Sequence, residues 1–128
     1  MKYYISTSYD GTFDEAIEKV TSELKKEGFG ILTEIDLKET LKKKLDVDFK
    51  KYKILGACNP GLAHQALLKE EKIGTMLPCN VIVEEHENGE VEVSAVDPMA
   101  SMQAVENEGL TEIATQVRDL LEKVIKNI

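Results

Sequence analysis

The stretch of sequence that decides the fold is YKILGACNPGLA at positions 52–63. Its first seven residues, up to Cys58, are mostly apolar and predict a strand. Asn59 is favoured immediately before a helix and Pro60 is favoured at the first helical position. The sequence therefore predicts a strand that runs directly into a helix, with the thiol of Cys58 at the junction.

A second cysteine lies further along the chain, in Leu77-Pro78-Cys79, where the next predicted strand begins after an extended segment at 73–78. If the two strands are antiparallel, the end of the first and the start of the second coincide, and the two cysteines meet. If the strands are parallel, the cysteines fall at opposite edges of the sheet. The direction of the strands therefore decides whether the thiols can act together.

The next signal is Asn88-Gly89, the preferred pair for a two-residue hairpin turn. In that register Glu85 would lie opposite Glu92, which is an unfavourable like-charge pair. A bulge in the loop is the alternative. The hairpin implies that at least part of the sheet is antiparallel.

Helices are predicted on both sides of this region. Thr12 and Glu15 match a capping box at a helix start, and Gly28 suits the position after its end. After a strand at 30–36, a short surface helix has a narrow apolar stripe, and residues after Gly109 have a broad apolar face. With a first strand at 2–8, the order is βαβαβαββα, with room for a short helix before the last. This order predicts an α+β fold with a mixed or antiparallel sheet and helices mainly on one face.

Composition predicts one soluble domain over residues 1–128, because 42% of residues are hydrophobic, 31% are charged and no linker or repeat interrupts them. A net charge of −8 disfavours binding to nucleic acid and to anionic membranes. The first residues do not resemble a secretory signal, and no apolar run approaches the roughly 18 residues of a membrane span. We therefore expect a cytoplasmic protein with reduced cysteines, no nucleic-acid partner and no membrane partner.

Cys58 is the most informative residue for chemistry. The amides of Gly61 and Leu62, together with the helix dipole, could stabilise its thiolate or a bound anion. If Cys79 lies nearby, the pair could exchange between dithiol and disulfide, or bind a soft divalent metal with His64 as a third ligand. The structural alternative is that Cys58 is a small buried apolar residue.

His86 lies among Glu84, Glu85, Glu87 and Glu90, and these side chains could bind a divalent ion. We favour the simpler interpretation that they form a charged edge strand, which resists aggregation. The motifs GxGxxG, GxxxxGK[ST], HExxH and GxSxG are absent, which argues against common nucleotide enzymes, zincin proteases and hydrolases.

Two segments together, ILGACNP at 54–60 and LPC at 77–79, resemble the family catalogued as domain of unknown function 302. The pattern extends over nearly the whole chain through GF at 28–29, EID at 34–36 and DPM at 97–99. The resemblance implies a compact α+β fold and a homodimer, and it implies no established activity. The positions that match in the two cysteine segments are Cys58, Asn59, Pro60, Leu77, Pro78 and Cys79.

Our leading hypothesis is a small, dimeric cytoplasmic binding or regulatory domain with a pocket for a small ligand, an anion or a metal. The predicted pocket residues are Cys58, Asn59, Pro60, Gly61, Leu62, Leu77, Pro78 and Cys79. The first alternative is a thiol-dependent redox or sulfur-transfer protein in which Cys58 is the nucleophile and Cys79 resolves it. The second is a structural homodimeric interaction module.

Overall fold

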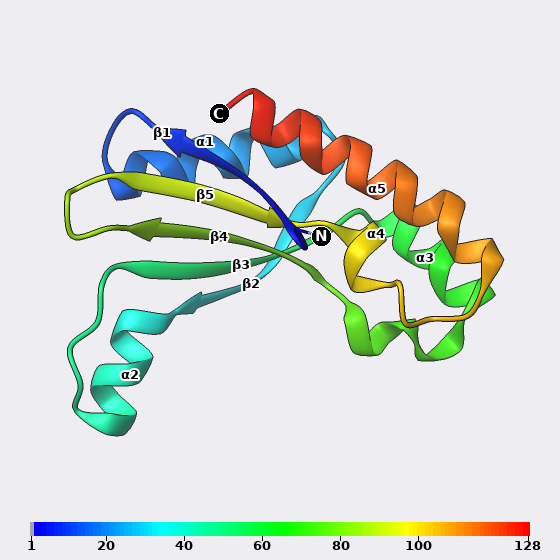
Figure 1. Cartoon of the computed structure of the whole chain (residues 1–128), viewed down its shortest axis with the longest axis horizontal. Coiled ribbons are helices and arrows are strands. Elements are labelled where there is room, and N and C mark those ends of the chain that lie inside the picture. The colour runs from blue at the N-terminus through cyan, green and yellow to red at the C-terminus, as the bar shows by residue number, and fades with distance from the viewer. Residues whose placement is uncertain (1) are drawn as a thin grey trace.

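Five strands form one sheet in the computed structural model, which describes residues 2–128 (Figure 1). In space they follow the order β1-β5-β4-β3-β2, so β4 is central. Each neighbouring pair of strands is antiparallel. The predicted α+β fold is therefore confirmed, and of the mixed and antiparallel sheets that the sequence allows, the antiparallel one forms. The strands are β1 Tyr4–Tyr9, β2 Gly30–Asp36, β3 Tyr52–Cys58, β4 Cys79–Glu85 and β5 Val91–Val96.

The helices follow the predicted order, and a short helix, α4, precedes the last one. They are α1 Phe13–Lys26, α2 Leu37–Leu45, α3 Pro60–Lys69, α4 Pro98–Ser101 and α5 Glu108–Lys126. The prediction that residues 73–78 are extended is wrong for most of that segment, because Glu71–Met76 form a 3₁₀ helix. This helix buries Ile73, and it rises about 2 Å per residue instead of the roughly 3.3 Å of a strand. The chain therefore travels a shorter distance before β4 begins.

The core lies between the sheet and the two long helices, α1 and α5, which pack on the same face (Figure 1). Helical spacing places apolar side chains of α1 and α5 toward the sheet, where Val81, Val83 and Val93 are fully buried. Each such side chain contributes roughly 1.5–3 kcal/mol when it leaves water. The buried helix residues include Phe13, Ala16, Val20, Leu24, Leu110, Ile113, Val117, Leu121 and Val124.

The ends of α1 confirm the local signals in the sequence. The Thr12 hydroxyl accepts a hydrogen bond from the Glu15 amide at 3.1 Å, and the Glu15 carboxylate accepts one from the Thr12 amide at 3.0 Å. At the other end Gly28 has a φ of +86°, and the Phe29 amide donates to the Leu24 carbonyl at 2.9 Å. This left-handed turn directs Phe29 into the core.

The opposite face of the sheet is not covered by α1 or α5. Successive side chains of a strand point to opposite sides, so Ile82 and Glu84 face away from the buried Val81 and Val83. Both are half-buried. Along the described part of the chain, no helix is long and apolar enough to cross a membrane.

The β4–β5 hairpin forms, but its register differs from the two-residue turn. Glu85 pairs with Val91 and Glu84 pairs with Glu92, so the two-residue register that would place Glu85 opposite Glu92 does not form and the bulged alternative does. The His86 amide donates to the Glu90 carbonyl at 2.8 Å, and only Gly89 within the loop has a positive φ, at +86°. The loop is therefore one residue longer, with glycine in the left-handed position that a bulged three-residue turn requires.

We expect Gly89→Ala to lower the free energy of unfolding by about 1 kcal/mol, because alanine is strained at this positive φ. No atom lies within 4 Å of the added methyl group, so the cost comes from the backbone alone. Urea unfolding followed by circular dichroism measures it. Gly30→Ala is the matched control, because its methyl group also has open space and its φ is not positive. Equal losses in the two variants would contradict this explanation.

Candidate functional site

The two cysteines come together because β3 and β4 are antiparallel. Ala57 pairs directly with Cys79, and Cys58 is the next residue of β3. Pairing distances across a sheet and the rise along a strand place the Cα atoms of Cys58 and Cys79 roughly 6 Å apart. A disulfide needs Cα atoms within about 7 Å, a limit that this separation meets, and it also needs side chains that point toward each other. Both cysteines are free thiols in this structure.

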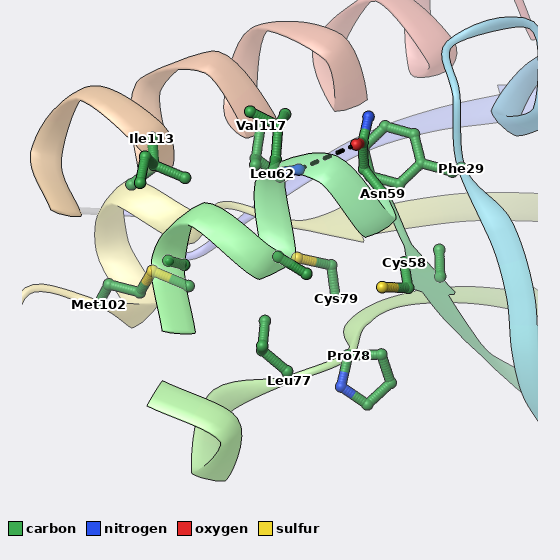
Figure 2. Close-up of a pocket in the computed structure, with 14 residues that line it drawn as sticks. Phe29, Cys58, Asn59, Leu62, Leu77, Pro78, Cys79, Met102, Ile113 and Val117 are labelled. Carbon is green, nitrogen blue, oxygen red and sulfur yellow. Dashed lines mark hydrogen bonds between the residues drawn. The ribbon is translucent and has the colours of Figure 1, made fainter. Parts of the chain in front are cut away.

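The helix start beside Cys58 forms as the sequence predicts. Asn59 caps α3, and its side-chain oxygen accepts a hydrogen bond from the Leu62 amide at 3.2 Å (Figure 2). Pro60 occupies the first turn of α3. Because the cap already binds the Leu62 amide, one of the two amides predicted to hold an anion has a partner within the protein.

A small pocket lies at this corner of the fold, with a volume of about 30 Å³. Figure 2 shows both cysteine side chains at the pocket, which is enclosed by α3, α5 and the start of β4. A single water molecule needs roughly 10–15 Å³ measured in this way, so the space suits a small group or one or two atoms. Its lining residues are Phe29, Ala57, Cys58, Asn59, Leu62, Ala63, Ala66, Leu77, Pro78, Cys79, Met102, Ile113, Ala114 and Val117.

Six of the eight predicted pocket residues line this space, whereas Pro60 and Gly61 are exposed and do not. The lining residues that the sequence did not indicate include Phe29, Met102, Ile113 and Val117. Helical periodicity indicates that Ile113 and Val117 are buried, and the turn at Gly28 indicates that Phe29 is buried. None of these signals indicates that they share a pocket with the cysteines.

The pocket is apolar, and this environment affects the two thiols differently. Burial, with a smaller contribution from the neighbouring Cys58, raises the pKa of Cys79 to about 11. Cys79 is 8% exposed, while Cys58 is partly accessible at the end of β3. Between residues 2 and 128, no charged side chain lines the pocket. Cys79 is therefore a protonated thiol at neutral pH.

The third metal ligand that the sequence suggests does not reach this pocket. His64 is exposed on α3 and is not a lining residue. Of the residues that the structure describes, only Glu84, His86 and Glu92 form a group of three metal-ligating side chains whose ligand atoms lie within 4.8 Å of one another. The two cysteines therefore provide a pair of thiol ligands, to which His64 adds no third.

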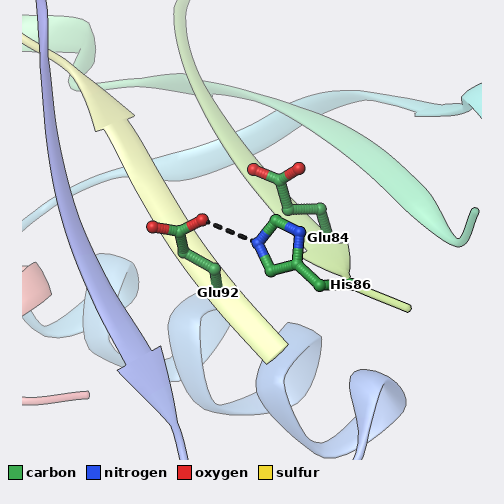
Figure 3. Close-up of side chains that lie close together, drawn as sticks. All are labelled: Glu84, His86 and Glu92. Atoms are coloured by element: carbon green, nitrogen blue, oxygen red, sulfur yellow. Dashed lines mark hydrogen bonds and ion pairs between the residues drawn. The ribbon is translucent and has the colours of Figure 1, made fainter. Parts of the chain in front are cut away.

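The charged residues around His86 do not lie on an edge strand, although the sequence predicts one. That interpretation is wrong, because β4 and β5 lie inside the sheet and the edges are β1 and β2. Figure 3 shows that His86 lies between Glu84 and Glu92. Glu92 was not in the predicted group because only the strand pairing places it opposite Glu84.

These features define an α+β domain with a pair of thiols in an apolar pocket. The model of the family described as "Domain of unknown function DUF302" matches residues 4–128. The chain belongs to this family, which confirms the resemblance found in the sequence.

A solved structure has the same architecture. It is the crystal structure of an uncharacterized conserved DUF302 protein from Bacillus stearothermophilus, whose sequence is 28% identical to this chain. The two structures match over 99% of this chain and 98% of that chain, with a TM-score of 0.92. No curated protein matches the chain. The comparisons establish the family and the fold, and the activity has to be inferred from the site.

Proposed function

We propose that the protein is a thiol-dependent redox protein in which Cys58 and Cys79 form a reversible disulfide. The observation that carries the proposal is that two free thiols on neighbouring antiparallel strands line the same small pocket. Their estimated Cα separation, roughly 6 Å, falls within the range of natural disulfides. In the cytoplasm, the location that the sequence predicts, the reduced form would be the resting state.

The different environments of the thiols support separate roles. Cys58 is the more accessible thiol and precedes the start of α3, so it is the nucleophile. Its thiolate attacks a small disulfide such as oxidised glutathione, forms a mixed disulfide and releases one glutathione thiolate. Cys79 then loses its proton to solvent and attacks the Cys58 sulfur, which releases the second glutathione. The two cysteines lose two electrons, and the glutathione disulfide gains them.

The same features give less support to the other ligands of this pocket. An anion would enter a space without a charged lining residue, where the Leu62 amide already has a partner. A soft divalent metal would find two thiols and the thioether of Met102, whereas zinc sites usually have at least three Cys, His or carboxylate ligands. The small volume also disfavours a drug-sized molecule. The pocket contains two thiols, and thiol chemistry is therefore the function that its lining residues support best.

Oxidised glutathione at pH 8 tests the proposal, with intact-mass spectrometry as the measurement. We expect the native chain to lose the mass of two hydrogen atoms, with a Cys58–Cys79 link in the peptide map. Cys79→Ser should instead gain the mass of one glutathione at Cys58, because the resolving thiol is gone. Cys58→Ser should remain largely unmodified, because Cys79 is buried and protonated.

The two single variants are matched controls, since each removes one sulfur and keeps the size of the side chain. The proposal fails if the native chain accumulates glutathione on both cysteines without an internal disulfide. It also fails if both thiols remain reduced under conditions that oxidise a free dithiol. The homodimer implied by the family resemblance stays a prediction, as does the soft metal.

A further inference from the structure

A second concave site lies on the sheet face that α1 and α5 leave uncovered. It has a volume of about 410 Å³, within the range of roughly 300–1,000 Å³ typical of small-molecule sites. Strand alternation brings polar and aromatic side chains together there from β1, β3, β4 and β5. The lining residues are Tyr3, Tyr4, Tyr52, Asn80, Ile82, Glu84, Glu92, Ser94, Ala95 and Val96. We call this site the tyrosine hollow.

Two carboxylates line the tyrosine hollow and are held in place by neighbouring groups. Glu84 accepts a hydrogen bond from the Lys50 ammonium group at 2.6 Å. Glu92 accepts one from the Ser6 hydroxyl at 2.9 Å, and its other oxygen lies 2.9 Å from Nε2 of His86. Glu84 and Glu92 are directly opposite in the sheet register. Two like charges in that position require compensation.

With His86 neutral, the charges in this cluster do not balance. Lys50 lies 3.5 Å from Nδ1 of His86, so a neutral imidazole can accept a hydrogen bond from Lys50 and donate one to Glu92. Glu84 and Glu92 then carry two negative charges against the single positive charge of Lys50. One negative charge is left beside a partly buried hollow. One additional positive charge would neutralise it.

The aromatic walls favour the same kind of ligand, because tyrosine faces attract cations. The protein's own ammonium groups already lie near two of these rings. Lys50 Nζ is 5.9 Å from the centroid of Tyr52, and Lys2 Nζ is 5.8 Å from that of Tyr4. Lys50 also contacts Glu84, so this ammonium group has both an aromatic and a carboxylate partner.

We propose that the tyrosine hollow binds a small organic cation, an amine with one positive charge and an apolar body. The charge would lie against Glu92, and the apolar body would contact Tyr4, Tyr52 and Ile82. A monocation neutralises the residual charge, whereas a divalent metal at Glu84, His86 and Glu92 would exceed it while Lys50 remains. The hollow and the thiol pocket share no lining residue, so this activity is separate from the redox proposal.

Titration of the native, reduced chain with benzylamine tests this inference, with amide chemical shifts in ¹H–¹⁵N spectra as the measurement. We expect saturable shifts at residues of the tyrosine hollow. Benzyl alcohol, which has a similar body and no charge, should bind at least about tenfold more weakly, the loss typical of a missing charged hydrogen bond. Equal responses to benzylamine and benzyl alcohol would overturn the proposal.

Glu92→Gln removes one negative charge and keeps a side chain that can bond to Ser6 and His86. We expect it to weaken benzylamine binding about tenfold. Glu85→Gln is the control, because it removes the same charge from the adjacent strand position without lining the hollow. Unchanged affinity in Glu92→Gln, or an equal loss in both variants, would contradict the assignment.

A second variant tests the same site in case Glu92→Gln does not fold. Tyr52→Leu keeps an apolar side chain and removes an aromatic face, so benzylamine binding should weaken about threefold. Zinc chloride is tested separately in a Cys58→Ser/Cys79→Ser background, where the thiols cannot bind it. Saturable zinc binding at His86 without any response to benzylamine would replace the organic cation with a metal.

Discussion

Gly56→Ala should lower the free energy of unfolding by about 2 kcal/mol, because the added methyl group would be too close to two neighbouring side chains. Gly56 is buried in β3 between the neighbouring strands, two residues before Cys58. An added methyl group would overlap the Thr33 hydroxyl and would lie 2.8 Å from Cγ of Pro78. The methyl group has contacts on both sides, so β3 cannot relieve one without worsening the other. Urea unfolding measures the loss.

The double variant Thr33→Ala/Gly56→Ala isolates the cause. Thr33 is exposed, so Thr33→Ala alone should cost little. In that background the overlap with the Thr33 hydroxyl is gone while the close contact with Pro78 remains, and the cost of Gly56→Ala should fall by about 1 kcal/mol or more. The same cost in both backgrounds would show that contact with Thr33 is not responsible. This glycine therefore allows the segments that carry Cys58 and Cys79 to approach each other closely.

The sequence predicts local structure well where a few neighbouring residues determine the backbone. The capping box at Thr12, the turn at Gly28 and the helix start at Asn59 all appear in the structure. Each uses hydrogen bonds or backbone angles within a few residues, so no distant part of the chain is needed to form it. The same holds for the apolar face of α5, whose period is visible in the sequence.

Contacts between strands are harder to predict because their register depends on distant residues. The sequence leaves the relative direction of β3 and β4 open, although that direction brings Cys58 beside Cys79. The hairpin signal at Asn88-Gly89 is correct, yet one additional loop residue changes the pairing to Glu84 with Glu92. A shift of one residue reverses which side chains face the core, so small differences in a loop have large effects.

The residues that form the thiol pocket and the tyrosine hollow are also hard to predict from the sequence, because they come from distant segments. The cysteine segments identify one wall of the pocket, but Phe29 comes from the turn that follows α1 and Val117 comes from α5. The hollow combines residues that are far apart in the sequence, such as Tyr4 and Glu92. Local patterns indicate which side chains are apolar or charged. Tertiary packing decides which of them meet.

The second large effect concerns Cys79 at alkaline pH. Its pKa is raised from 9.0 to about 11 in the folded protein, chiefly by burial. Between these values the unfolded chain loses the thiol proton while the folded protein keeps it. Unfolding thus becomes more favourable as the pH rises, and stability should fall by about 2 kcal/mol from pH 9 to pH 11. Below pH 9 the full contribution of Cys79 is retained.

Other groups also titrate in this range, so the measurement is the difference between the native chain and Cys79→Ala. Urea unfolding at several pH values should show an extra alkaline loss only when Cys79 is present. A parallel dependence on pH in the two proteins would contradict the prediction. Formation of the proposed disulfide removes the ionisable thiol, so the oxidised native chain should lose this component as well. An oxidised protein that retained it would place Cys79 outside the disulfide and would count against the redox function.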